Sequence, residues 1–123
     1  MRVYPNATRM VIAESQFNDP PKAGRQFLIA RVRASYRGPK GSDTFDGGFR
    51  LRAVGRSNVS YTSFEDSCGV TPDEDALDKE VFRGGTVEGN VCWSVKRSDV
   101  GSLVAYDDGG WSFNAQRPYF KLH

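Results

Sequence analysis

The acidic side chains of residues 65–80 are the largest group of possible metal ligands in this 123-residue chain. Calcium prefers carboxylate oxygens, so the segment is a candidate calcium site. Its ligands would be Asp73, Asp75, Asp78 and Glu80, although the spacing lacks the glycine and the terminal glutamate of an EF-hand loop. The favoured alternative is a set of acidic residues at the start of a helix, where the helix dipole stabilises negative charge.

The residues of a hydrolytic centre are sparse. His123 is the only histidine and the last residue, whereas a catalytic triad needs a base that the fold holds in place. Asp107 and Asp108 form a carboxylate pair such as glycoside hydrolases use, but the two glycines that follow are typical of a turn. No glycine-rich segment ends in the Gly-Lys-Ser/Thr of a phosphate-binding loop. We therefore predict a protein that is not an enzyme and uses no cofactor.

Arginines recur at every second position of two apolar segments. Arg31 and Arg33 alternate with apolar residues in the first segment, and Arg50 and Arg52 do so in the second. If the two segments are neighbouring strands, these arginines would form one basic face for an acidic protein, a polysaccharide or a lipid headgroup. Like charges opposite one another on a sheet repel, so the alternative is a solvated face whose arginines pair with acids such as Glu88.

Cys68 and Cys92 are the only cysteines. A bond between them would fasten the acidic segment to a later strand and would constrain the unfolded chain by about 3.5 kcal/mol in the entropic model. The chain has too few soft ligands for a zinc site and lacks the Cys-x-x-Cys spacing of a redox pair. We predict a disulfide, and with it an oxidising compartment; the alternative is a pair of reduced thiols in the cytosol.

The elements that must position these residues are short strands. Turn-forming residues recur about every ten positions, and the segments between them are rich in β-branched and aromatic residues. Strict alternation of apolar and polar residues predicts half-buried strands at 27–36, 49–54 and 86–96. Less regular patterns predict further strands at 9–17, 59–64, 103–106, 111–114 and 119–122. Such a rhythm is typical of an all-β sandwich or barrel.

Apolar side chains share one face of each alternating strand. The inward set is Leu28, Ala30, Val32, Ala34, Tyr36, Phe49, Leu51, Ala53, Val87, Val91, Trp93 and Val95. Gly89 also takes an inward position, where it would mark a bulge or a close approach of another backbone. Asn90, Cys92 and Ser94 fall on the outward face.

One segment breaks the β pattern. Thr71 can cap a helix, the proline after it suits the first helical position, and Glu74 supports the cap. Leu77 and Val81 lie four residues apart and could share one face of a helix. We predict one or two helical turns over residues 72–79, linking two strands.

Length and composition fit one globular domain over residues 1–123, with enough aromatic residues to bury a core. The formal net charge of +2 is too small for a nucleic-acid-binding protein. No apolar stretch is long enough to span a membrane, and the first residues contain no apolar segment of signal-peptide length.

Four segments resemble the immunoglobulin-like, telokin-like domains of unknown function found on bacterial lipoproteins and small secreted antigens. They are AGRQFLIARVRA at 23–34, FRL at 49–51, GTVEGNVCWSV at 85–95 and SLVAY at 102–106. The resemblance implies an immunoglobulin-like antiparallel β-sandwich of about 7–9 strands with one short helical connection. It also implies a place outside the cell membrane, usually behind a lipid anchor or signal peptide. It implies no agreed activity and assigns no catalytic residue.

These observations predict a non-catalytic interaction module of a secreted or cell-envelope protein. It would bind a protein or another envelope ligand through a strand edge, a loop end or the arginine face. Strand addition at an edge uses main-chain hydrogen bonds and therefore needs no signature side chains. The alternative is a sandwich that binds calcium or a small ligand at the acidic segment 65–80.

Overall fold

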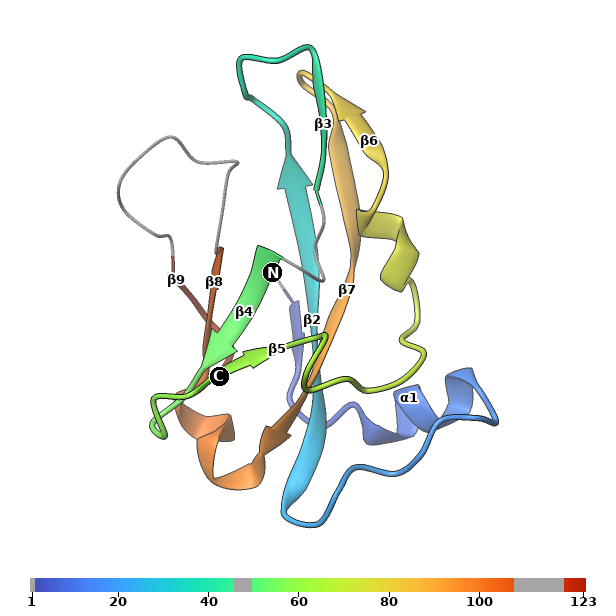
Figure 1. Ribbon diagram of the computed structural model, residues 1–123, viewed down its shortest axis with the longest axis vertical. Coiled ribbons are helices and arrows are strands. Elements are labelled where there is room, and N and C mark those ends of the chain that lie inside the picture. The colour runs from blue at the N-terminus through green and yellow to red at the C-terminus, as the bar shows by residue number, and fades with distance from the viewer. Residues whose placement is uncertain (1, 46–49, 108–118) are drawn as a thin grey trace.

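A computed structural model describes residues 2–45, 50–107 and 119–123 (Figure 1). The strands in these ranges are β1 (Arg2–Tyr4), β2 (Arg25–Ser35), β3 (Ser42–Thr44), β4 (Leu51–Val54), β5 (Ser60–Thr62), β6 (Glu80–Phe82), β7 (Thr86–Lys96), β8 (Val104–Asp107) and β9 (Tyr119–Lys121). The helical elements are α1 (Thr8–Glu14) and the 3₁₀ helices η1 (Glu74–Leu77) and η2 (Arg97–Ser102). No helix in the described ranges is long and apolar enough to cross a membrane.

Two antiparallel sheets enclose the main core. One sheet has the order β1-β2-β7 and the other has the order β5-β4-β8-β9. β2 and β7 form the longest ladder, which runs from Arg25 opposite Lys96 to Ser35 opposite Thr86. β3 and β6 form a two-stranded ribbon at one end of the long axis of the molecule (Figure 1). The predicted all-β antiparallel sandwich with a short helical connection is confirmed.

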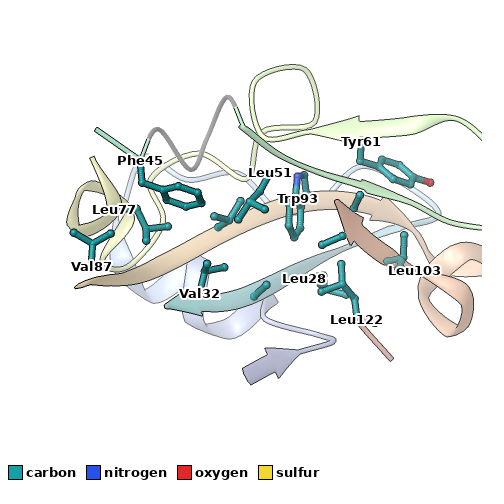
Figure 2. Close-up of a cluster of buried hydrophobic side chains, with 14 of the residues drawn as sticks. Leu28, Val32, Phe45, Leu51, Tyr61, Leu77, Val87, Trp93, Leu103 and Leu122 are labelled. Atoms are coloured by element: carbon teal, nitrogen blue, oxygen red, sulfur yellow. The ribbon is translucent and has the colours of Figure 1, made fainter. Parts of the chain in front are cut away.

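The alternating positions of the strands build the core, as the sequence predicts. Figure 2 shows side chains of both sheets, among them Leu28, Leu51 and Trp93, gathered between the strands. Leu28 and Trp93 are fully buried. The predicted strands at 59–64, 103–106 and 119–122 are present with slightly different bounds. Phe49, the predicted strand at 111–114 and the turn before it lie outside the described residues.

The prediction of a strand at 9–17 is wrong, because residues 8–14 form α1. Ala7 and Val11 lie four residues apart and are both fully buried, which is the spacing of one helix face. They pack on Phe27 and Ile29 of β2, on the side of the sheet that faces away from the main core. A short amphipathic helix therefore covers part of the second face of this sheet and creates a second, smaller core.

The outward positions of β7 are also covered, contrary to prediction. Asn90 is 6% exposed and Ser94 is 7% exposed. The segment before and through η1 runs along the free edge of β7, where Ser94 N–H donates to the carbonyl oxygen of Asp66 at 2.8 Å. The Asn90 amide donates to the carbonyl oxygen of Pro72 at 2.9 Å. The segment before η1 therefore covers the free edge of β7. The alternation of apolar and polar residues in β7 does not predict this cover.

The predicted helical connection is one 3₁₀ turn, η1, and it begins later than Thr71 suggests. The residue before it is Asp73, in the left-handed region with φ 53°, and no side chain caps the turn. Gly89 is the reason that η1 can lie so close to the sheet. A Cβ atom there would meet the carbonyl oxygen of Asp73 and Cγ of Leu77, both at 2.9 Å. The ladder continues through Gly89 opposite Val32, so the glycine marks a close approach and not a bulge.

Candidate interaction surface

Arg31 is held by side chains of two neighbouring segments. β2 places it on the face opposite Leu28. Its guanidinium donates to Oε1 of Glu88 and Oδ2 of Asp73, both at 3.1 Å, and to Oδ1 of Asn90 at 3.4 Å. The bond to Glu88, and then the bond to Asp73, raise the pKa of Arg31 above its ordinary value. The charge of Arg31 is therefore balanced within the fold, as the solvated-face alternative anticipates.

The four predicted arginines do not share one face. Arg31 and Arg33 lie on β2, whose neighbours are β1 and β7, whereas Arg52 lies on β4, whose neighbours are β5 and β8. Arg50 directly precedes β4, and its guanidinium lies 5.9 Å from the centre of the Phe45 ring. Outward side chains of two packed sheets point in opposite directions, so the prediction that these two strands are neighbours is wrong. Ligand binding by either pair stays a prediction.

The acidic segment 65–80 has its charges spread over separate partners. Asp66 forms an ion pair with Arg25 at 3.0 Å, and the side chain of Asp66 is only 16% exposed. Asp73 forms its ion pair with Arg31, on a different part of the sheet. These carboxylates therefore fasten the segment to two points along β2.

The predicted calcium ligands Asp73, Asp75, Asp78 and Glu80 do not form a cluster. Glu80 accepts a hydrogen bond from the hydroxyl of Ser42 across the β3–β6 ribbon, at 3.0 Å. Nowhere in the ranges 2–45, 50–107 and 119–123 do three His, Cys, Asp or Glu side chains lie close enough together to hold a metal ion. This part of the chain offers no ready-made carboxylate cluster for calcium.

Cys68 and Cys92 form the predicted disulfide, with their Cα atoms 6.1 Å apart. The bond ties the segment before η1 to the middle of β7. Cys92 does face away from the main core, but α1 helps to cover it, and each cysteine is only 4% exposed. Both pack with Phe27, Ile29 and Val11 in the second core. The disulfide is therefore an internal part of the packing.

A cleft of about 650 Å³ lies beside the disulfide, between the loop that follows α1 and residues 65–69. Its lining includes Phe17, which is 84% exposed, and Lys22. Arg25 also lines it, next to its ion-pair partner Asp66. The cleft therefore contains the exposed ring of Phe17 and the ion pair between Arg25 and Asp66.

Asn18 holds the loop that forms this cleft. Its Nδ2 donates to the carbonyl oxygens of Val11 at 2.7 Å and Val70 at 2.8 Å, and its Oδ1 accepts the N–H of Val70 at 2.8 Å. In the sequence, residues 18–21 indicate only a turn. The contacts with Val70 join positions 52 residues apart, so no local pattern could have predicted the cleft.

Asp99 is a fully buried carboxylate that no sequence pattern identifies. Ser57 donates to it from its N–H at 3.1 Å and its hydroxyl at 2.5 Å, and the Tyr61 hydroxyl donates at 2.6 Å. Burial raises the pKa of Asp99, but the hydrogen bonds from Ser57 and Tyr61 outweigh burial and bring the pKa below its ordinary value. A Cβ atom on Gly55 would lie 2.8 Å from Cβ of Asp99, so the β4–β5 turn fits closely over η2.

The remaining sequence candidates are Asp107, Asp108 and His123. Asp107 ends β8, opposite Leu51 of β4, and Asp108 lies outside the described residues. Nδ1 of His123 is 2.9 Å from the carbonyl oxygen of Leu103. The histidine ring therefore contacts main chain next to β8.

No family model, no curated protein and no solved structure matches this chain. The resemblance to immunoglobulin-like domains stays a prediction, and the functional argument depends on the geometry of this chain alone.

Proposed function

We propose that this chain is an immunoglobulin-like interaction module of a secreted or cell-envelope protein and is not an enzyme. The observation that carries this proposal is the Cys68–Cys92 disulfide, because disulfides persist in oxidising compartments and are rare in the cytosol. The bond lies inside the packed second core, so the oxidised pair is part of the packing of the fold.

Several charged side chains of the described residues are bound to other groups of the fold, which favours a binding role over a catalytic one. The most deeply buried carboxylate of the described residues, Asp99, accepts hydrogen bonds that join two turns. Arg25 and Arg31 are paired with carboxylates of the acidic segment. The surface also presents exposed aromatic rings, including Phe17 at 84% and Phe82 at 65% exposure. Exposed aromatic side chains suit contacts with a partner.

Thiol trapping in the native host tests the compartment. Cells are quenched in acid, and the protein is alkylated under denaturing conditions before and after reduction. We expect no alkylated cysteine before reduction and alkylation of both Cys68 and Cys92 after it, because the pair is oxidised where the protein resides.

A cytosolic protein with known free thiols in the same sample is the control for artefactual oxidation. Alkylation of both cysteines before reduction would show a reducing compartment and would overturn the proposal.

A further inference from the structure

One end of the molecule carries basic side chains around an exposed aromatic ring. The loop of residues 36–41 and the turn between β6 and β7 lie together at the end of the long axis (Figure 1). We call Arg37, Lys40, Phe82 and Arg83 the basic tip. Arg37, Lys40 and Arg83 are exposed, and Phe82 is 65% exposed.

Hydrogen bonds fix the shape of the basic tip. Nε of Arg83 donates to the carbonyl oxygen of Gly38 at 3.2 Å, and Nη2 donates to the carbonyl oxygen of Pro39 at 2.6 Å. The main chain of Tyr36 exchanges hydrogen bonds with the turn, since its carbonyl accepts from Gly84 at 2.9 Å and its N–H donates to Gly85 at 3.0 Å. The tip is preorganised, so little conformational entropy is lost when it binds.

The tip concentrates positive charge. Residues 36–42 and 82–85 contain three basic residues and no acidic residue. The formal net charge of the whole chain is +2, so the rest of the chain has a net charge of −1. Among the residues that the structure describes, no acidic side chain forms an ion pair with Arg37 or Lys40. In contrast to Arg31, these side chains are available to an external anion.

The nearest acids along the ribbon have local partners. Glu80 accepts from the Ser42 hydroxyl, and Oδ1 of Asp43 accepts from the N–H of Thr44. A shallow, open depression lined by Arg37, Gly38, Pro39 and Arg83 lies at the tip. The guanidinium group of Arg37 provides donors that phosphate oxygens bind, whereas Nε and Nη2 of Arg83 already donate to main-chain carbonyls of the loop.

We propose that the basic tip docks on a membrane surface that contains anionic lipid. The proposal rests on the proposed function, because it names the surface and the partner of the interaction module. Lys and Arg are attracted to the negative surface potential of such a membrane, and an exposed aromatic ring partitions into the interface. The tip protrudes at the end of the long axis, a shape that can touch a planar surface (Figure 1).

Sedimentation with lipid vesicles tests this proposal on the oxidised chain. We expect the protein to bind phosphatidylcholine vesicles that contain phosphatidylglycerol and not vesicles of phosphatidylcholine alone. Binding should weaken with added salt, because ions screen the surface charge. The double variant Arg37→Glu/Lys40→Glu should bind at least about tenfold more weakly, since each basic residue near an anionic surface contributes about fivefold to affinity. Phe82→Ser should also weaken binding, by about fivefold or more.

The control variant Arg56→Glu/Arg97→Glu changes the net charge by the same amount at the other end of the molecule. Both residues are exposed, in the β4–β5 turn and in η2. This variant should bind the anionic vesicles about as well as the wild type, because its changes lie far from the tip. Thermal melts of all variants check that each is folded; Arg83 is left unchanged because it supports the loop.

Three results would overturn the proposal. They are absence of binding to the anionic vesicles, an equal loss of binding in the control variant, and binding that is insensitive to Phe82→Ser but is displaced by a soluble polyanion. The last result would identify an acidic polymer as the partner. A failure in this assay is distinguishable from failure of the proposed function, because the thiol-trapping result is independent of lipid.

Discussion

Asp99 shows what a single residue contributes to this fold. Its carboxylate is fully buried, yet its pKa is lowered, because Ser57 and Tyr61 donate hydrogen bonds to the charged form. The pKa is therefore lower in the folded chain than in the unfolded chain, where the ordinary value applies. A carboxylate of this kind stabilises the fold above its unfolded pKa, and the contribution is lost as the pH falls through the folded pKa.

We predict that Asp99→Asn lowers the free energy of unfolding at pH 7 by about 2–3 kcal/mol, because an amide cannot accept all the donors that surround it. Urea unfolding at pH 7 and at about pH 3 measures this effect. The difference from wild type should narrow at the lower pH, because the Asp99 carboxylate is protonated in the unfolded chain there and part of its stabilising contribution is lost.

Asp19→Asn is the matched control, because Asp19 is exposed. It should change stability by less than about 0.5 kcal/mol. An equal effect of the two substitutions would contradict the role assigned to the network around Asp99.

At the scale of elements, the close approach of η1 to β7 depends on Gly89. The glycine leaves room for the main chain of Asp73 and the side chain of Leu77, which carries η1 into the main core. Leu77 is buried and Asp73 is ion-paired with Arg31, so a shift of either would disturb packing or an ion pair.

Gly89→Ala should therefore lower the free energy of unfolding by about 1–3 kcal/mol through overpacking. Gly101→Ala is the control, since a Cβ atom at Gly101 in η2 would meet no atom within 4 Å. That change should be neutral or stabilise slightly, because it restricts the unfolded chain. Urea midpoints with unchanged slopes would measure both effects, and a neutral Gly89→Ala would show that η1 is free to move.

Some elements could be predicted from local patterns and others could not. The strands at 27–36 and 86–96 alternate strictly, so their presence and their buried inner faces are confirmed, whereas their pairing into one sheet is a finding of the structure. α1 was missed because seven residues contain only one buried apolar position, Val11, and its helical partner Ala7 precedes the helix. Short elements that are stabilised mainly by tertiary packing carry too few residues for a period to be recognised.

At the scale of the whole molecule, the disulfide fastens the segment before η1 to the central sheet within the second core. Cys68 lies in the segment that runs along the edge of β7, and Cys92 lies in β7 on the face that packs in the second core. The bond closes a loop with a sequence separation of 24, so it restricts the unfolded chain as well as the folded one.

We predict that Cys68→Ser/Cys92→Ser lowers the free energy of unfolding by about 3.5 kcal/mol, as the loop-closure entropy requires. Urea unfolding of this variant, beside reduced wild type, measures the effect. The two samples should agree within about 1 kcal/mol, because both lack the cross-link. A variant as stable as oxidised wild type would show that the bond contributes nothing to folding.

The sequence alone determined the β-sandwich, the inner faces of its long strands, the helical connection and the disulfide, because each follows from a local period or from the only available pair of thiols. The tertiary structure decided which charges are neutralised and which are exposed. Arg31 and Arg37 look alike in the sequence, but folding brings Glu88 and Asp73 to the first and no described ion-pair partner to the second. Electrostatic pairing depends on distances between segments far apart in the chain, and those distances exist only after the sheets have packed.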